Sequence, residues 1–423
     1  MKVAVIGGGS TYTPELIDGF ARLREVLPIT ELWLVDPDES RLELVSGLAR
    51  RIFSRAGHTG IIKTTSVVGD GVSDADIVLI QLRVGGQTAR HGDETFPHKG
   101  CCIGQETTGP GGFAKALRTV PVVLDIAETV RAKAKPGAWI IDFTNPVGIV
   151  TRALQQAGHR AVGLCNVAIG FQRKFADLLG TDHSKVSLNH VGLNHLTWEL
   201  GVNLRTDQGT RDVLPELLKS DIDHIASDVR MPQALLRLQG AVPSYYLRYY
   251  YLHDTVLGEQ QYGRSRAQEV QDVESALLAK YADPSLAVKP EELSQRGGAF
   301  YSEAAVDLMA SLTSNRGDTQ IVNVRNDGAL PFLPDDHVIE VPAVIESDKL
   351  TVQPIAPLPE DMRGLISAVA GYERLALDAA LHGGRDRVVR AMLAHPLVGQ
   401  YEKAERLTDL LLAENQQYLT WAR

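Results

Sequence analysis

The chain has 423 residues, of which 44% are hydrophobic and 22% charged, and it carries a formal net charge of −9 with a pI near 5.8. A chain of this length buries a large core and is expected to form two domains. The acidic balance provides no basic face for nucleic acid or for a membrane surface, so neither is an expected partner.

The N-terminal residues do not resemble a targeting segment. Their apolar run, residues 2–6, is broken by glycines far short of a signal-peptide core or a spanning helix. The cysteines, Cys101, Cys102 and Cys165, are odd in number, and adjacent cysteines rarely meet disulfide geometry. We therefore expect a cytoplasmic protein with reduced thiols.

The first 36 residues have the pattern of a dinucleotide-binding unit. A β-branched strand over 2–6 is followed by three glycines, and Thr13 and Pro14 start a helix. A second apolar strand, ELWLVDPD, ends at Asp36. Glycines let backbone N–H groups approach a pyrophosphate, and an acid at this point holds ribose hydroxyls. The predicted cofactor contacts are Gly7, Gly9, Ser10, Thr11, Asp36 and Arg83.

Three further apolar strands are expected, over 75–82, 138–146 and 161–166, with helical patterns such as 119–133 between them. This alternation predicts an α/β fold with a Rossmann-type, doubly wound parallel sheet. Because ligands bind beyond the carboxyl ends of such strands, the residues that follow them should face one crevice. Those residues are Arg83, Asn145, Cys165 and Asn166.

The second half of the chain is less regular. A helix is expected over 167–179, strand-like segments over 186–203, and helical stretches over 211–280 and 361–422. We therefore expect two domains, a Rossmann-like cofactor domain at 1–166 and an α-rich α+β domain for substrate, metal and oligomerisation at 167–423.

The segment CIGQETTGPGGFAKALR, residues 102–118, is glycine-rich and is expected to be a loop with Glu106 at its centre. The alternative is a surface loop with a solvated acid. A loop of this composition after a cofactor-domain strand favours an active-site position.

Two further features have both a structural and a functional interpretation. Cys165 and His195 are soft and borderline metal ligands, but their spacing matches no zinc motif, and a lone buried cysteine is usually inert. The run PSYYLRYYYLHD, residues 243–254, holds five tyrosines, a pattern more typical of packing than of catalysis. One tyrosine near a cation could still act as a base.

Ordered motifs along the whole chain favour the functional interpretation of both features. These motifs are, in chain order, GGGSTYTPEL, IQLRVGGQTARHGDE, GQETTGPGGFAKALR, DFTNP, GLCN, VGLNHLTW, YYLRYYY and NDGALPFLPDDHVIEVP. Through them the chain resembles glycoside hydrolase family 4, specifically its 6-phospho-β-glucosidase branch, an NAD-dependent exception among glycosidases.

The resemblance implies a reaction in which carbon-3 of the sugar is transiently oxidised by NAD. The ketone acidifies the carbon-2 proton, a tyrosine removes it, the aglycone is eliminated, and water and then hydride are added back. The metal, usually Mn²⁺, would act as a Lewis acid.

Carried over by motif, Cys165 and His195 correspond to the metal ligands. Tyr246 corresponds to the base, with Tyr245 as the alternative, and Glu106 to an acid that increases the basicity of the tyrosine. The α-specific branch has Asp after the cysteine as general acid, and the amide of Asn166 cannot supply a proton, which favours a β-glycoside. The predicted substrate contacts are Arg90, Asn145, Asn166 and Arg266.

The expected substrate is a phosphorylated disaccharide or an aryl β-glucoside, with Arg83, Arg90 or Arg266 as candidates for the phosphate. The long helices favour a homodimer or homotetramer. Two alternatives share the N-terminal pattern: an NAD-dependent 2-hydroxy-acid dehydrogenase of the lactate or malate type, and a non-catalytic NAD-binding regulator.

Overall fold

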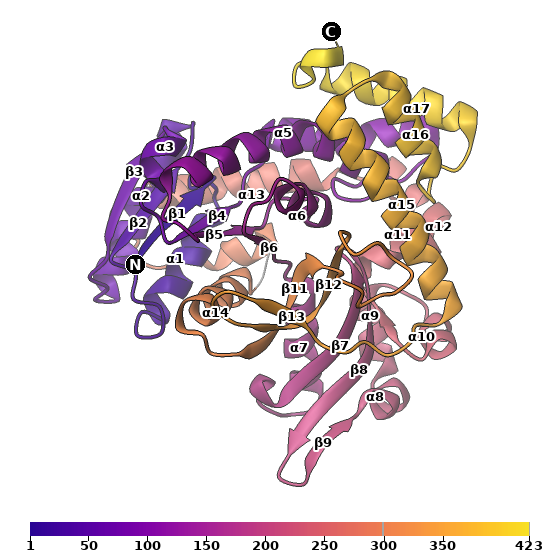
Figure 1. The fold of residues 1–423 in the computed structure, drawn as a ribbon, viewed down its shortest axis with the longest axis horizontal. Coiled ribbons are helices and arrows are strands. Elements are labelled where there is room, and N and C mark those ends of the chain that lie inside the picture. The colour runs from indigo at the N-terminus through magenta and orange to yellow at the C-terminus, as the bar shows by residue number, and fades with distance from the viewer. Residues whose placement is uncertain (298–299, 423) are drawn as a thin grey trace.

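A nine-stranded sheet organises the fold in the computed structural model, which describes residues 1–297 and 300–422. Its strand order is β13-β12-β11-β6-β5-β4-β1-β2-β3, and β1 to β6 run parallel (Figure 1). The parallel strands are β1 (Lys2–Ile6), β2 (Glu31–Val35), β3 (Ile61–Thr65), β4 (Ile77–Ile80), β5 (Trp139–Asp142) and β6 (Ala161–Gly163).

The predicted strands are confirmed where they form continuous apolar runs. All four residues of β4 and of β5 are buried, as expected for a sheet covered on both faces. The sequence analysis did not predict β3. Its sequence, IIKTT, lies at the sheet edge and buries only Ile62, so it lacks the apolar run of the central strands.

Three strands from far along the chain extend the same sheet with antiparallel pairing. They are β11 (Asp318–Arg325), β12 (Val338–Ile345) and β13 (Leu350–Val352). β11 joins β6 where Asn323 pairs with Gly163. A Cβ on Gly163 would lie 2.3 Å from Thr151 Oγ1 and 2.9 Å from Asn323 Cβ, so only glycine permits this approach. The sheet thus includes residues on both sides of the predicted boundary at 166.

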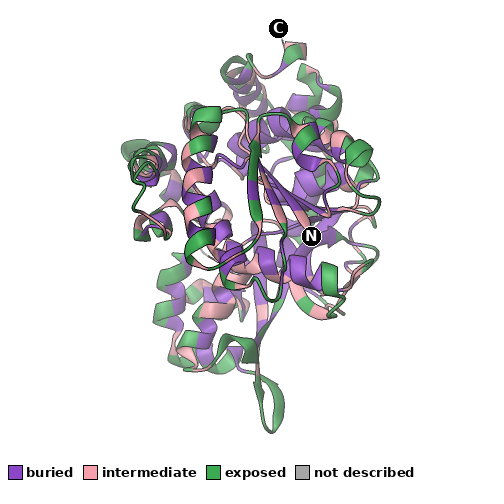
Figure 2. Cartoon of the chain, turned by 90° about the vertical axis from the view of Figure 1, so that its left-hand side faces the viewer, coloured by how far each residue is buried: buried purple, intermediate pink, exposed green. Residues whose placement is uncertain are grey.

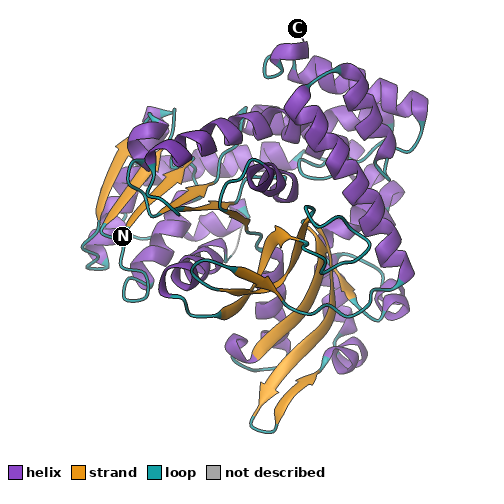
Figure 3. Cartoon of the chain, viewed as in Figure 1, coloured by secondary structure: helices purple, strands orange, loops and turns teal. Residues whose placement is uncertain are grey.

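A second, antiparallel sheet projects away from the first (Figures 1 and 3). It contains β7 (Val186–Leu193), β8 (Leu196–Thr206), β9 (Gly209–Asp212) and β10 (Val242–Pro243). Leu193 pairs with Leu196, so the β7–β8 hairpin turns through Asn194 and His195 alone. β12 packs against β7 and joins the two sheets.

Helices cover the first sheet and form a separate layer at the C-terminus (Figure 3). They are α1 (Thr13–Arg22), α2 (Glu39–Arg55), α3 (Val68–Val72), α4 (Gly86–Thr95), α5 (Gly109–Lys133), α6 (Val147–Gln156), α7 (Val167–Leu178), α8 (Leu214–Ser220), α9 (Ile222–Val229), α10 (Gln233–Gln239), α11 (Arg248–Tyr251), α12 (His253–Tyr262), α13 (Arg266–Tyr281), α14 (Tyr301–Ser314), α15 (Glu360–His382), α16 (Arg385–Ala394) and α17 (Tyr401–Asn415). Short 3₁₀ segments are η1 (Phe96–Gly100), η2 (His183–Lys185), η3 (Tyr245–Leu247), η4 (Glu291–Arg296) and η5 (Thr420–Ala422). None of the helices in the described ranges has the length and apolarity needed to span a bilayer.

The prediction of a loop over residues 102–118 was wrong in part, because α5 begins at Gly109. The glycines serve close packing: a Cβ on Gly111 would lie 2.3 Å from the Asp93 carbonyl oxygen, and one on Gly112 would lie 2.5 Å from the Thr107 carbonyl carbon. Glycine in this segment therefore marks a helix start that is packed against neighbouring backbone.

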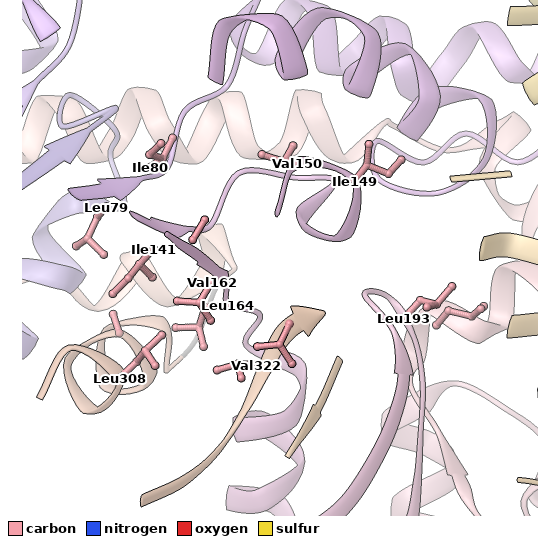
Figure 4. Packing of buried hydrophobic residues seen from close by; sticks show 14 of the residues in the cluster. Leu79, Ile80, Ile141, Ile149, Val150, Val162, Leu164, Leu193, Leu308 and Val322 are labelled. Carbon is pink, nitrogen blue, oxygen red and sulfur yellow. The ribbon is translucent and has the colours of Figure 1, made fainter. Parts of the chain in front are cut away.

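Buried residues gather along the central strands and the helix faces that cover them (Figure 2), and apolar side chains from both faces of the first sheet build the core (Figure 4). Leu79 lies on the same side as Leu308 of α14, whereas the adjacent Ile80 points to the opposite face, as alternation along a strand requires (Figure 4). All three are fully buried. Burying one such side chain contributes about 1.5–3 kcal/mol, and this core holds the strand ends in place.

Candidate active site

A cleft of about 1520 Å³ opens where β1, β2, β4 and β5 end. The first residues beyond these strands line it, as expected for a parallel sheet. Among the predicted site residues, the ones that line the cleft are Gly7, Gly9, Ser10, Asp36, Arg83, Arg90, Glu106, Asn145, Asn166, His195, Tyr246 and Arg266. Thr11 and Cys165 are buried outside this lining.

The glycine turn has the geometry expected of a dinucleotide site. Gly7 has φ 84°, and a Cβ there would lie 2.7 Å from the Gln81 carbonyl oxygen. Asp36 Oδ2 accepts a hydrogen bond from Gly9 N at 2.9 Å, which fixes the acid beside the turn. A glycine turn that lines the cleft, with a carboxylate beside it, fits a pyrophosphate and a ribose.

The side chain of Thr11 is held by other protein residues. Its hydroxyl donates to Glu274 Oε1 at 3.2 Å and accepts from Arg296 Nε at 2.7 Å. Glu274 also pairs with Arg41 of α2 at 3.5 Å. The Thr11 side chain thus ties the glycine turn to α13 and η4, and its contact with the cofactor remains a prediction.

Glu106 is a buried carboxylate surrounded by three cations. Lys115 Nζ donates to Oε2 at 2.6 Å, Arg90 Nη2 lies 3.2 Å from Oε1, and Arg83 also hydrogen-bonds the carboxylate. Burial would raise the pKa of Glu106, but Arg83, Arg90 and Lys115 outweigh it and hold the pKa well below its ordinary value. Glu106 is therefore ionised at any working pH.

The sequence analysis missed Lys115. Burial, together with Arg83, lowers the pKa of Lys115 to about 7, although Glu106 opposes the shift. The residue lies on α5 between the apolar residues Ala114 and Ala116, both fully buried. A lysine within such an apolar stretch was the signal that could have identified it.

His195 lies at the tip of the β7–β8 hairpin with φ 63°, in the left-handed region. Its Nδ1 is 2.8 Å from Thr107 Oγ1, and that hydroxyl donates its hydrogen to Gln105 Oε1 at 2.8 Å. Since a hydroxyl has a single hydrogen, Nδ1 must be the donor to Thr107. We therefore assign the tautomer that leaves a lone pair on Nε2, and burial keeps the ring neutral by lowering its pKa to about 4.

Cys165 follows β6 and precedes α7, where the backbone N–H groups of Asn166 and Val167 favour the thiolate and so act to lower the pKa of the thiol. Burial and the Glu340 carboxylate nevertheless raise the pKa of the thiol. No cluster of three or more His, Cys, Asp or Glu ligands occurs in the described part of the chain. Cys165 and His195 can thus supply two ligands of an open site, with the remaining positions left for substrate and water.

Tyr246 brings these groups together. Its ring stacks on the His195 ring at 3.6 Å between centroids and 6° between planes. Burial raises the pKa of Tyr246, the charges of Cys165 and Glu106 add to this effect, and Arg90 opposes it. The tyrosine is therefore protonated until a cation is bound nearby.

The remaining predicted contacts surround this centre. Asn145 Oδ1 is buried and has no hydrogen-bond partner within the described residues, as expected of a group that binds a ligand. Asn166 is the N-cap residue of α7. Arg266 begins α13 and is half-exposed; it donates to Glu269 at 2.9 Å and to the Gln295 carbonyl oxygen at 2.6 Å.

The chain was compared with known proteins. The model of the family 4 glycosyl hydrolases matches residues 2–181, and that of the family's C-terminal domain matches 190–398. A probable 6-phospho-β-glucosidase of Bacillus subtilis is 38% identical, over 99% of this chain and 97% of its own. The structure of the 6-phospho-β-glucosidase from Thermotoga maritima with manganese, NAD⁺ and glucose 6-phosphate has a TM-score of 0.92 at 34% identity, with 99% of each chain covered.

The doubly wound sheet, the glycine turn and the cleft beyond the strand ends define a Rossmann-type enzyme of the dinucleotide-binding class. Within that class, the chain belongs to the family 4 glycosyl hydrolases. This membership extends over the whole chain and favours hydrolysis over the alternatives of a dehydrogenase or a non-catalytic regulator.

Replacing Glu106 by Gln removes the anion that pairs with Arg83, Arg90 and Lys115 and that makes Tyr246 more basic. Turnover should fall by about 10- to 100-fold, the usual range for a group that acts through its neighbours. Steady-state kinetics measures it, with Glu292→Gln as control because its ion pair with Lys280 is on the surface. Wild-type turnover in Glu106→Gln would contradict this role.

Proposed function

We propose that the chain hydrolyses 6-phospho-β-glucosides with NAD and a divalent cation, by transient oxidation at carbon-3, proton abstraction at carbon-2, elimination and addition of water. The observation that carries the proposal is the ring contact of Tyr246 with His195 beside a dinucleotide cleft, with the Cys165 thiol close enough to affect the pKa of Tyr246. Relatives from Bacillus subtilis and Thermotoga maritima have 6-phospho-β-glucosidase in their names, and the latter was solved with manganese, NAD⁺ and glucose 6-phosphate.

When bound, NAD supplies a hydride acceptor for carbon-3 and the cation, Mn²⁺ or another divalent metal, supplies a Lewis acid for the carbonyl oxygen. Gly7, Gly9 and Asp36 hold the dinucleotide. Cys165 and the Nε2 atom of His195 hold the metal. A thiolate is a soft ligand for a metal that prefers oxygen, so the site should be labile and sensitive to oxidation.

Tyr246 removes the carbon-2 proton. In the chain alone its burial holds the proton on the phenol, and the charge of a cation bound by the stacked His195 lowers this barrier. Glu106 acts in the opposite direction and keeps the phenolate basic enough to take the proton. The cation thus makes loss of the phenol proton possible, and Glu106 keeps the resulting phenolate a strong base.

Asn145 and Asn166 bind sugar hydroxyls, and Arg90 orients the substrate beside Glu106. Arg83, Arg90 and Lys115 outnumber the carboxylates that pair with them, Glu106 and Glu94, and this local positive charge supports an anionic substrate in an otherwise acidic protein. Arg83, Arg90 and Arg266 are the candidates for the 6-phosphate. The aglycone is a second sugar or an aryl group.

The organisation of the chain is part of the proposal. Residues 1–166 form the NAD-binding domain, and residues 167–423 bind substrate and metal and mediate self-association as a homodimer or homotetramer. Exposed apolar side chains on the C-terminal helices support self-association: Leu381, Leu393 and Tyr401 are 42%, 40% and 55% exposed. Free cysteines and a metal-binding thiol support a reducing compartment, the cytoplasm.

Hydrolysis of p-nitrophenyl β-glucoside 6-phosphate, compared with its unphosphorylated analogue, tests the proposal. With NAD and Mn²⁺ the phosphorylated substrate should release p-nitrophenol, whereas the analogue should react at least about 100-fold more slowly, because it lacks the charge that binds the arginines. NADH absorbance should not rise steadily. Net NADH formation, or equal rates for the two substrates, would contradict the proposal.

Metal removal gives a second expected outcome. Exhaustive chelation should abolish turnover, since without a cation Cys165 and Tyr246 both keep their protons. Mn²⁺ together with a reductant should restore it, whereas Mn²⁺ added to thiol-oxidised protein should not. Full activity of the chelated protein would exclude the metal role.

A further inference from the structure

A buried ionic triad links the two sheets behind Cys165 and His195. It consists of Glu199 on β8, His190 on β7 and Glu340 on β12. His190 Nδ1 is 2.6 Å from Glu199 Oε1, and Nε2 is 3.1 Å from Glu340 Oε1. The three side chains are at most 2% exposed. None of them lines the cleft, so the proposed reaction does not use them directly.

The charge state of the triad follows from its hydrogen bonds. Carboxylates only accept, so both ring nitrogens of His190 must donate, which makes the ring an imidazolium. Burial lowers the pKa of His190, but Glu199 and Glu340 outweigh it and raise the pKa to about 10. Two carboxylates and one imidazolium leave a buried net charge of −1.

Glu340 connects this triad to the hairpin tip. Its Oε2 accepts from Asn194 Nδ2 at 2.8 Å and from Asn323 Nδ2 at 3.1 Å. Asn194 directly precedes His195 in the two-residue turn, and Asn323 lies on β11 of the first sheet. The carboxylate therefore fixes the tip of the hairpin against the cofactor-binding sheet.

The Asn194 amide also acts on Cys165, where it favours the thiolate and so opposes the rise in the pKa of the thiol. An amide group has two N–H donors, so the same side chain can serve Glu340 with one and the sulfur with the other. A single carboxylate thus sets the orientation of an amide whose residue directly precedes one proposed metal ligand, His195, and which acts on the other, Cys165. Such outer contacts orient metal ligands and tune their affinity.

We propose that Glu340 is a positioning residue which, through Asn194, holds Cys165 and His195 in the geometry that binds the divalent cation. The inference rests on the metal role in the proposed function. The buried negative charge of the triad also stabilises a cation held in front of it. A merely structural ion pair would join β7, β8 and β12 without any effect on metal affinity.

Glu340→Gln in the full chain tests the proposal. The Gln amide either turns its N–H₂ group toward Asn194 and Asn323 and breaks the link to the hairpin tip, or faces His190, whose ring must then give up its Nε2 proton. In both cases a neutral amide replaces the charged acceptor of Asn194. Mn²⁺ binding, measured from the free-ion signal in electron paramagnetic resonance with NAD present, should weaken about 10- to 100-fold. NAD affinity should be unchanged, and saturating Mn²⁺ should restore turnover.

Asn194→Ala keeps the triad and removes only the link to it, so it should weaken Mn²⁺ binding to a similar degree even if Glu340→Gln folds poorly. Asp212→Asn is the matched control. Asp212 lies at the distal end of the same sheet, where its Oδ1 accepts from Val202 N and Leu214 N, so its loss should affect stability and leave Mn²⁺ affinity unchanged.

Wild-type Mn²⁺ affinity in both Glu340→Gln and Asn194→Ala would overturn the positioning role and leave the proposed function intact. Equal weakening in Asp212→Asn would overturn it as well, because the effect would then follow general loss of stability. If the wild-type chain itself bound no Mn²⁺, the metal role in the proposed function would fall, and the positioning role with it.

Discussion

Exclusion of water around Cys165, His195 and Tyr246 is the constraint on which the rest of the site depends. Burial acts on each group in the direction of its neutral form: it raises the pKa of the thiol and the phenol and lowers that of the imidazole. Without a cation the three groups form a neutral, unreactive cluster. With one, the thiol and the phenol can lose their protons together, so metal binding and base formation are coupled by the same burial.

The fold creates this constraint by bringing distant segments to one place. Cys165 comes from the end of a parallel strand, His195 from the tip of a hairpin in the second sheet, and Tyr246 from a short 3₁₀ turn. The charged groups around these three residues form two separate sets. Arg83, Arg90, Lys115 and Glu106 face the cleft, whereas the Glu199–His190–Glu340 triad lies behind the ligands.

Much of the first sheet could be predicted because β1, β2, β4, β5 and β6 are apolar runs followed by turn residues. The edge strand β3 and the late strands β11–β13 could not, because their place depends on long-range pairing such as that of Asn323 with Gly163. The residues 109–118 were expected as loop, since glycine composition alone does not separate a flexible segment from a tightly packed helix start.

The site, like the first sheet, could be predicted only in part. Residue chemistry alone favoured an inert thiol and a packing stripe of tyrosines, and only the ordered motifs indicated that Cys165, His195 and Tyr246 work together. The structure places His195 and Tyr246 in ring contact. Lys115 and Glu340 were not predicted, because a lone charged residue in an apolar segment reveals its partners only once the fold is known.

Hydrolysis in deuterium oxide tests the central claim, that Tyr246 takes a proton from carbon-2, most directly. The sugar phosphate released by the wild-type chain should carry deuterium at carbon-2, as read by mass spectrometry and proton NMR. Tyr246→Phe should bind NAD normally, yet neither turn over nor exchange that hydrogen. Product without deuterium at carbon-2, or normal turnover of Tyr246→Phe, would contradict the account.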